Sequence, residues 1–471
     1  MCSKSTLYVY EPEAWEKACN RQYEIIGSAA GCKEVADGIL LPMRLIPKTA
    51  EIYGDGLFEG GICDAEGHFV TGQRCHYDKD FSTRSCIRSY EIDPVELEYC
   101  DETVIFGGVA CRHWGHMLLD TSSRLWYPVL NPDLPYKTVF IRFPKQDFPH
   151  KELMDLVGMD ESRYMIIDRP TRFRKVIIPD EAFFSLSGHF RREWLAFFDA
   201  ALAKVEPAIH KKVYLTRTAF GIDNVVGEQF FEDFYVSRGY EVFSPEKMSV
   251  HDQIALMKGA DEIVTTMGTI SHMAVFAHRG AKITVLNRSR TMVPAQLSIC
   301  EARELSACYV EVYDSFLPEV QAGNSVVLLA PNRNWRNYVK DTFAEKFNEH
   351  EEEEILRSLF LEYIKKWAQH YLDNPRLFRW VSRQDSADLI SHISQVFLNK
   401  QIDPDSYMTA ADLQIRDLQN RYLQLEKDYG KLQARYDGLR HSFSWRSGRI
   451  ITWPLRVAQK LFHYQKTTGK G

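Results

Sequence analysis

The chain has 471 residues, of which 45% are hydrophobic, and its formal net charge is -6. This length allows roughly two to four globular domains with sizeable cores. The acidic balance argues against a nucleic-acid-binding protein, because such proteins carry basic surfaces. No basic segment followed by an apolar core opens the chain, and no run of about eighteen uncharged apolar residues occurs, so we expect a cytoplasmic protein.

Eight of the ten cysteines lie within the first 111 residues, a density that raises the question of a disulfide or zinc framework. Successive cysteines in this segment are all more than ten residues apart and no CxxC pair occurs, unlike the closely spaced ligand pairs of structural zinc sites. We therefore expect reduced thiols and no bound metal. A Cys/His metal protein stays as an alternative, because His68 and His76 lie near these cysteines, and "DAE" at 64–66 also keeps a metal site open.

Residues 1–100 are rich in glycine, cysteine and short mixed segments, which predict short strands and loops. The β-rich runs "TVIF", "KTVFIRF", "YMIID" and "KVIIP" follow between about 103 and 180, with helical patterns over about 114–130 and 150–158 between the first three. Another helix is predicted over about 189–205, ending before Pro207. We expect an N-terminal α/β domain over 1–205.

The stretch "CRHWGHMLLDTSSRLWYP", residues 111–128, places polar residues in a pattern that otherwise predicts a buried amphipathic helix. His116 and Asp120 are four residues apart and would share one helix face, with Arg124 one further turn along. Two interpretations stay open at this point. The pair either forms a hydrogen bond that only orients the helix, or it belongs to a site that moves protons.

The second half of the chain alternates strands and helices regularly. Strands are predicted at "KVYLT", "YEVF", "DEIVTT" and "KITVLN", and helices at "GEQFFEDFYVSRG", "SVHDQIALMKG" and "TISHMAVFAHRG". Ser249 and Asp252 predict a capping box, and a glycine stands where each of the three helices ends. The alternation predicts parallel βαβ units, so the fold class is α/β with two Rossmann-like domains facing a cleft.

Polar and flexible residues follow the strand ends of this second unit. Arg217 follows the first strand, Glu228 opens the first helix, and the third strand leads into Gly268 and Thr269 before the next helix. A helix N-terminus carries unpaired N–H groups and partial positive charge, so a diphosphate can bind there with Arg217 as a bidentate partner. An ordinary tight turn is the simpler explanation of a lone glycine at 268.

These segments, in this order, resemble the catalytic domain of glycosyltransferase family 61, especially its bacterial capsular-polysaccharide members. The resemblance runs over roughly residues 100–290 and rests on the strand ending in Thr-Arg, on "GYEVFSPEKMSVHDQIALMKGADEIV", and on Gly-Thr-Ile-Ser-His followed by "AVF". "HWGHMLLD" is similar to the family's N-terminal "gHfllD" element. The other positions that match the family pattern are Arg217, Glu228, Glu246, Gln253, Ala260, Gly268, His272 and Phe276.

The resemblance implies a GT-B architecture and an inverting, metal-independent transferase without a cofactor. A hexosyl or pentosyl group would pass from a nucleotide sugar, expected to be UDP-linked, to a surface or capsular polysaccharide or a lipid-linked glycan. Residues 1–205 would then be the acceptor-side domain, and residues 206–330 would form the nucleotide-sugar-binding Rossmann-like domain. The implied donor-binding residues are Arg217, Glu228, Glu246, Gln253, Gly268, Thr269 and His272.

An inverting transfer needs a base for the proton of the acceptor hydroxyl, and the opening stretch offers two candidates. We expect His116 to be the general base, with Asp120 holding its ring, because a neutral imidazole accepts protons near neutral pH. The alternative is that Asp120 is the base and His116 binds the acceptor.

The chain departs from the family pattern in three respects. Gly227 replaces the usual asparagine, Asp223 and Asn224 stand where a cation is expected, and Met267 occupies the place of a histidine. These departures bear on the donor nucleotide, and they favour an alternative function, a non-catalytic transferase-like scaffold held at the membrane.

The C-terminal third predicts helices and then a coiled coil. Residues 331–403 have a helical pattern, in which "EEEE" at 351–354 is a solvated face. Apolar residues recur at alternating spacings of four and three from Ala411 to Leu439, which predicts a coiled coil over 408–440 and a homodimer. Packing of this helix against the body is the alternative.

The last 31 residues, 441–471, contain three arginines, three lysines and no acidic residue, interleaved with aromatic and aliphatic side chains. Such a basic amphipathic tail predicts peripheral contact with an anionic membrane, on the inner face of the plasma membrane. Docking on the protein's own surface is the alternative. "SFSWR" and "PLR" in this tail resemble the C-terminal ends of bacterial surface-polysaccharide glycosyltransferases.

Overall fold

The computed structural model of the chain describes residues 5–374 with short gaps, together with Lys431. The gaps are residues 14, 16–25, 48–56, 73–84, 186, 219–223, 290–292, 316, 318–324 and 347–348. The predicted basic tail, the predicted coiled coil apart from Lys431, and the predicted helical region beyond residue 374 lie outside the described residues. The chain divides into two compact units, 1–315 with 326–366 and 316–325 with 367–471, and the sheets and the site described below lie in the first.

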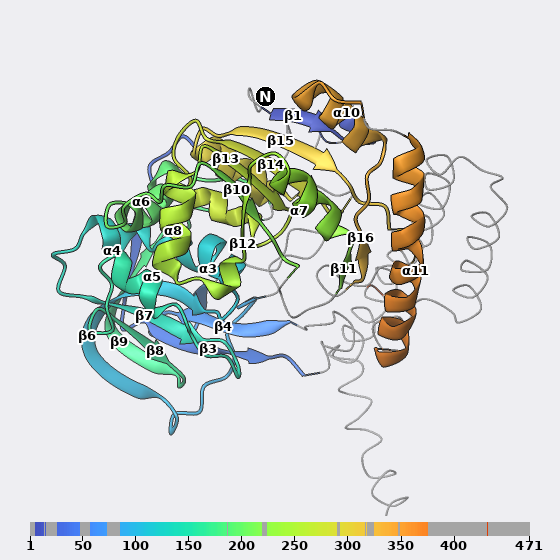
Figure 1. The fold of residues 1–471 in the computed structure, drawn as a ribbon. Coiled ribbons are helices and arrows are strands. Elements are labelled where there is room, and N and C mark those ends of the chain that lie inside the picture. The colour runs from blue at the N-terminus through green and yellow to red at the C-terminus, as the bar shows by residue number, and fades with distance from the viewer. Residues whose placement is uncertain are drawn as a thin grey trace, which may run out of the picture. The chain divides into compact units, whose positions relative to one another are not determined.

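An eight-stranded mixed sheet is formed mainly by the first 180 residues (Figure 1). Its strand order is β5-β4-β3-β9-β6-β7-β8, with β2 paired to β9. Strands β6 to β9 pair in parallel, and β2 to β5 pair antiparallel with their neighbours. The strands are β2 (Cys32–Ala36), β3 (Ile39–Leu45), β4 (Phe58–Cys63), β5 (Phe69–Thr71), β6 (Glu98–Ala110), β7 (Lys137–Arg142), β8 (Tyr164–Ile167) and β9 (Thr171–Pro179). The four β-rich runs predicted between 103 and 180 are thus confirmed as β6 to β9.

A six-stranded, wholly parallel sheet is formed mainly by residues 212–311 (Figure 1). Its order is β1-β15-β14-β13-β10-β12. The strands are β1 (Ser5–Tyr8), β10 (Lys212–Leu215), β12 (Glu241–Phe243), β13 (Glu262–Thr266), β14 (Lys282–Asn287) and β15 (Ser306–Glu311), while β11 (Val225–Val226) pairs separately with β16 (Val327–Leu328). The predicted alternation of parallel strands and helices is confirmed here. β1 lies in this sheet and not beside the strands that follow it in sequence. The predicted domain boundaries stay predictions.

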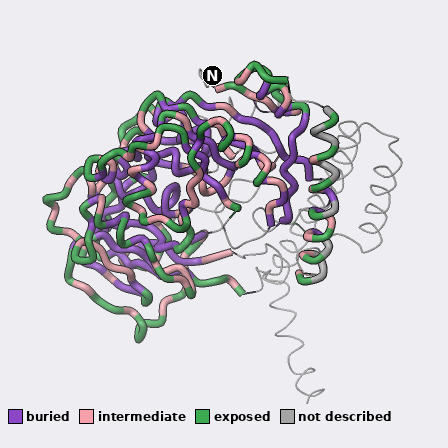
Figure 2. The backbone as a smooth tube through the Cα atoms, in the orientation of Figure 1, coloured by how far each residue is buried: buried purple, intermediate pink, exposed green. Residues whose placement is uncertain are grey.

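Helices connect the strands, and many of them pack with both sheets in one apolar core. The helices are α3 (Trp114–Leu119), η1 (Thr121–Arg124), α4 (Trp126–Leu130), α5 (Lys151–Leu156), η2 (Arg192–Trp194), α6 (Leu195–Leu202), α7 (Glu228–Val236), η3 (Pro245–Lys247), α8 (Val250–Gly259), η4 (Ser271–Phe276), α9 (Pro294–Ala302), α10 (Arg333–Phe343) and α11 (Glu349–Asp373). The core contains Leu118 and Trp194 together with Ile254, Phe276 and Ile299. Figure 2 shows the buried backbone concentrated in the two sheets and the segments between them.

The amphipathic helix predicted over about 114–130 is broken into three pieces. Two serine hydroxyls donate to carbonyls of the preceding turn, Ser122 Oγ to Leu118 O at 2.6 Å and Ser123 Oγ to Asp120 O at 2.7 Å. Such bonds compete with the helical pattern, and Pro128 cannot donate to the carbonyl of Arg124. Arg124 therefore leaves the predicted polar stripe and forms a buried ion pair with Glu181, Nη2 to Oε1 at 3.2 Å.

Local signals in the second half are confirmed more closely. Ser249 Oγ accepts the N–H of Asp252 at 3.0 Å, which is the predicted cap of α8.

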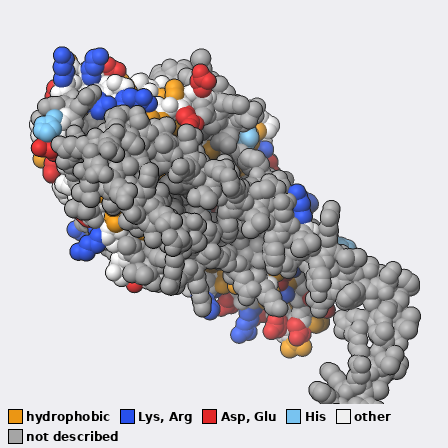
Figure 3. Space-filling model, turned by 90° about the vertical axis from the view of Figure 1, so that its right-hand side faces the viewer, with side chains coloured by type: hydrophobic (Ala, Val, Ile, Leu, Met, Phe, Trp, Pro, Cys, Tyr) orange, Lys and Arg blue, Asp and Glu red, His pale blue; other side chains and the backbone are white. Residues whose placement is uncertain are grey.

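Figure 3 shows acidic and basic side chains mixed along the described edges of the face that it presents. In the described part of the chain, no helix combines the length and the apolar character needed to cross a lipid bilayer.

Candidate functional site

The strand order of the parallel sheet reverses beside β10. The chain passes from β10 to β12 on one side, then returns to β13 on the other side and continues outward through β14 and β15. In open α/β sheets, ligands bind in the crevice outside the carboxyl ends of the strands at such a point. The segments that follow β10 and β13 are therefore the first place to search for a site.

Two arginines flank Gly268 at this edge of the sheet. Arg217 follows β10, Gly268 follows β13 and Arg288 follows β14, and these three strands are neighbours in register, since Leu215 lies beside Thr265 and Thr265 beside Val285. A Cβ atom at Gly268 would lie 3.3 Å from Arg288 Nη2 and 3.7 Å from Arg217 Nη1. The φ angle of Gly268 is +138°, so the turn also favours glycine by its backbone conformation.

Arg288 was missed in the sequence, where it is one of several cations after a predicted strand. Its Nε donates to Met267 O at 2.7 Å, which holds the guanidinium against the turn. The signal that identifies it is strand adjacency, because β13 and β14 are neighbours and their carboxyl ends meet at one edge. The two arginines supply two positive charges beside Gly268.

The turn after Gly268 leads into η4, a six-residue 3-10 helix, and not into the predicted α-helix. The N–H of Gly268 donates to Ser271 Oγ at 3.2 Å, and the same hydroxyl donates to Gly268 O at 2.7 Å. These local bonds close the turn. The predicted α-helix is therefore a 3-10 helix, whereas anion binding at its start stays a prediction, and the guanidinium groups add positive charge beside it.

Glu228, at the start of α7, lies next to Arg217 and is buried. Its Oε1 accepts the backbone N–H of Arg217 at 3.0 Å, and only 3% of the residue is exposed. Burial raises the pKa of this carboxyl to about 7, although the N–H bond from Arg217 and the charges of Arg217 and Arg288 oppose the rise. The carboxyl group can therefore change its charge near neutral pH.

Gly227 differs from the family pattern for a steric reason that the structure provides. Its φ angle is +91°, and a Cβ atom at this position would lie 2.0 Å from the carbonyl oxygen of Leu329. A side chain cannot fit without moving the backbone, so glycine is required at this position.

Glu246 and Gln253 lie on the segment that follows β12. Glu246, in η3, is exposed, and its charge acts on Arg217. Gln253, on α8, donates its amide to Pro245 O at 2.9 Å and to Met248 O at 3.2 Å. Gln253 thus ties the loop carrying Glu246 to α8, and its predicted contact with a donor stays a prediction.

His116 and Asp120 form a close pair after the carboxyl end of β6. His116 Nδ1 lies 2.6 Å from Asp120 Oδ2, and their side chains are 25% and 4% exposed. The second oxygen, Asp120 Oδ1, accepts a hydrogen bond from Ser185 Oγ at 2.8 Å. The carboxylate is thus held on both oxygens, while the imidazole keeps an accessible edge.

The segment carrying this pair packs directly against the turn at Gly268. A Cβ atom at Gly115 would lie 2.8 Å from Thr269 Oγ1, and Trp114 Nε1 donates to Met273 Sδ at 3.1 Å. His272 in η4 is 7% exposed, and burial, followed by the charges of His113 and His116, lowers its pKa to about 4. The structure therefore brings α3 and the Gly268 turn together.

Several buried polar atoms at this edge have no hydrogen-bond partner among the described residues. They are Thr266 Oγ1, both amide atoms of Asn287 and both ring nitrogens of His272. Thr266 and Asn287 are the last residues of β13 and β14, and buried polar groups are rarely left unpaired. A polar ligand would satisfy such atoms.

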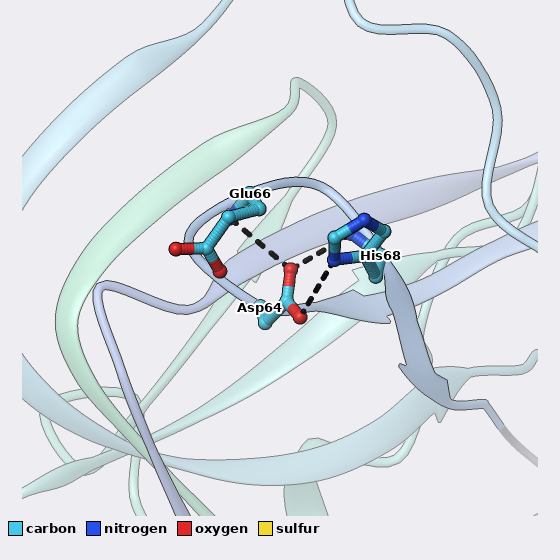
Figure 4. A group of neighbouring side chains, drawn as sticks. All are labelled: Asp64, Glu66 and His68. Carbon is cyan, nitrogen blue, oxygen red and sulfur yellow. Dashed lines mark hydrogen bonds and ion pairs between the residues drawn. The ribbon is translucent and has the colours of Figure 1, made fainter.

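Asp64, Glu66 and His68 form a separate carboxylate and histidine group, in the turn between β4 and β5 (Figure 4). Asp64 Oδ1 accepts the N–H groups of Glu66 and His68 at 3.1 and 2.8 Å, and Asp64 Oδ2 lies 3.2 Å from His68 Nδ1. These bonds are those of an exposed hairpin turn. Both carboxylate oxygens of Asp64 are used within the turn, so the group gives no independent sign of a metal.

Comparison with known proteins gives one family. No curated protein matches the chain. Residues 114–284, from the start of α3 to the middle of β14, match the model of Glycosyltransferase 61. This segment contains His116, Asp120, Arg217 and Gly268 and ends just before Arg288. The chain therefore carries a glycosyltransferase family 61 region, and this match supports a glycosyltransferase activity.

Proposed function

We propose that this protein is an inverting, metal-independent glycosyltransferase of GT-B architecture. It transfers a hexosyl or pentosyl group from a nucleotide sugar, UDP-linked, to a surface or capsular polysaccharide or a lipid-linked glycan. The observation that carries the proposal is the pair of arginines around Gly268, where the order of the parallel strands reverses. Guanidinium groups bind phosphate oxygens in bidentate geometry, and Gly268 leaves room for a diphosphate to approach.

The donor half of the site follows from these charges. Arg217 and Arg288 hold the diphosphate, and their positive charge stabilises the negative charge that grows on it as the glycosidic bond to phosphate breaks. The unpaired polar atoms of His272, Thr266 and Asn287 are available to hydroxyl or carbonyl groups of the donor.

The acceptor half uses the pair on α3. With Nδ1–H of His116 donating to Asp120, Nε2 carries the lone pair and serves as the general base. The acceptor oxygen attacks C1 of the donor sugar, its proton passes to His116 Nε2, and the electron pair of the C1–O bond leaves with the diphosphate. Asp120 is favoured as the residue that orients the ring, because its side chain is 4% exposed and both its oxygens are already bonded.

Nucleotide-sugar binding tests the proposal directly. A panel of nucleotide sugars is added to the purified full chain and the shift in thermal unfolding is measured, because a ligand at 100 times its dissociation constant adds about 2.7 kcal/mol of stability. Slow release of free sugar from the stabilising donor, without acceptor, is expected. A folded protein that neither binds nor hydrolyses any member of the panel would instead support the non-catalytic scaffold.

We also propose that the C-terminal residues bring the transferase to its acceptor. Residues 408–440 would form a dimeric coiled coil, and the basic residues of 441–471 would contact an anionic membrane. Deletion of 441–471 should abolish co-sedimentation with anionic vesicles, and the binding of the full chain should weaken as salt is added. Equal co-sedimentation of both proteins would contradict the membrane role.

A further inference from the structure

A cavity of about 350 Å³ lies beside the carboxyl end of β9, apart from the arginines at Gly268. This volume is within the range of small-ligand sites, roughly 300 to 1,000 Å³. Residues that line it include the cations Lys33, Arg124 and Arg191 and the acids Asp180 and Glu181. Three positive charges thus face two negative charges.

The two acidic groups of the cavity are already engaged by the protein. Glu181 forms the buried ion pair with Arg124, and Asp180 Oδ2 accepts the N–H of Gly31 at 3.0 Å. Arg124 is likewise engaged, since both terminal nitrogens of its guanidinium also donate to the carbonyls of Pro179 and Gly72.

The two other cations keep donors for a ligand. Arg191 uses Nη1 to donate to Glu181 O at 2.7 Å, and its buried Nε has no hydrogen-bond partner among the described residues. Lys33 is exposed on β2, directly beside Ile178 of β9, which also lines the cavity. The charge that remains available in the cavity is therefore positive.

The cavity adjoins the proposed general-base pair through two segments. Phe184 lines the cavity, and the next residue, Ser185, donates to Asp120 Oδ1 at 2.8 Å. Arg124 lies four residues after Asp120. The N–H of Ala182 donates to Ser123 O at 2.8 Å, which ties the segment after β9 to the segment that carries Arg124. Both β6 and β9 end here as parallel neighbours, so the loops after them enclose the acceptor side.

We propose that this cavity is an acceptor subsite that binds an anionic saccharide unit, with Arg191 and Lys33 as its cationic contacts. The assignment rests on the proposed transferase function, and it names the class of acceptor: a glycan that carries a carboxylate or a phosphate. A charged group in a partly enclosed cavity gains more from guanidinium contacts than a neutral sugar does, because charge-assisted hydrogen bonds are stronger. The donor diphosphate binds elsewhere, at Arg217 and Arg288.

The test measures saccharide binding to the full chain by ligand-observed NMR, in the absence of donor. The probes are glucuronic acid, glucose 6-phosphate and glucose, so that a carboxylate, a phosphate and no charge are compared. At least one anionic probe is expected to bind about tenfold or more tightly than glucose. Arg191→Gln and, separately, Lys33→Gln should remove about that factor, whereas Arg192→Gln, the same change at the exposed neighbouring residue, should not.

The outcomes separate this inference from the proposed function. Equal binding of all three probes, or unchanged anion binding in both Arg191→Gln and Lys33→Gln, overturns the subsite. Should the chain bind nucleotide sugars but no anionic probe, the subsite fails and the transferase proposal stands. Because Arg191 also bonds Glu181, Lys33→Gln on the exposed strand decides the case if Arg191→Gln does not fold.

Discussion

The two polar regions that meet at Thr269 hold their charged groups in opposite ways. On α3, His116 and Asp120 are paired at 2.6 Å and Ser185 binds the remaining carboxylate oxygen, so the geometry is fixed by hydrogen bonds. Around Gly268, two guanidinium groups converge on a glycine, and Glu228, which accepts the N–H of Arg217, is buried with a raised pKa. The first arrangement suits the movement of a proton and the second suits the holding of an anion. If this contrast is correct, mutations in the two regions should change different kinetic quantities.

The largest effect is expected from His116→Ala. Loss of the general base should lower kcat by roughly 100-fold or more, because such catalysis contributes about 100 to 10,000-fold, while the dissociation constant of the donor stays unchanged. Turnover is measured under saturating donor and acceptor, and donor binding by calorimetry. His251→Ala, at an exposed histidine also beside an aspartate, serves as the control. A variant that loses thermal stability but keeps its turnover per folded molecule would show that the pair is only structural.

Arg217→Ala and Arg288→Ala should act on the donor. Each removes a charge-assisted contact to phosphate worth about 1.5 to 3 kcal/mol, so donor affinity should fall roughly 10- to 150-fold. Calorimetric titration with the nucleotide sugar measures the effect, and Arg279→Ala, at an exposed arginine, provides the matched control. Unchanged donor affinity in both folded variants would remove the phosphate assignment.

The residues of these two regions were not equally accessible to prediction. Arg217 and Gly268 follow strands whose apolar runs and flanking helices are local signals, and so they were found. Arg288 requires the knowledge that β13 and β14 are neighbours, which no local pattern contains. The prediction for Arg124 was wrong because serine-to-carbonyl bonds and Pro128 break the helix. The spacing of the apolar residues predicts one continuous helix and gives no sign of that break. β1 joins β15 across three hundred residues, a pairing that only tertiary packing decides.

His272 lies between the two regions, and its burial predicts a dependence of stability on pH. Its pKa is about 4 in the folded chain and about 6.5 when unfolded, so the unfolded chain binds more protons between these values. The contribution of neutral His272 to the free energy of unfolding is complete above pH 6.5 and is lost as the pH falls toward 4. Between pH 7 and pH 5 the free energy of unfolding should fall by about 2 kcal/mol less in His272→Gln than in the wild type. Urea unfolding at both pH values measures this, with His251→Gln as the exposed control, and equal losses would contradict it.

The smallest and most specific effect concerns Glu228, because its charge opposes that of the anion region. Its pKa of about 7 means that the carboxyl is largely neutral at pH 6 and leaves both arginines to the diphosphate. As the pH rises through 7, the carboxylate forms beside Arg217 and repels the phosphates, so donor affinity should fall by about tenfold between pH 6 and pH 8.5. The phosphates of a nucleotide sugar are diesters and do not titrate in this range. Glu228→Gln keeps an acceptor for the N–H of Arg217 and should bind the donor with little dependence on pH, while Glu241→Gln, at an exposed glutamate, should behave as the wild type. A Glu228→Gln variant with the wild-type pH profile would mean that another group sets the charge of this region, and the contrast with the His116–Asp120 pair would then rest on the arginines alone.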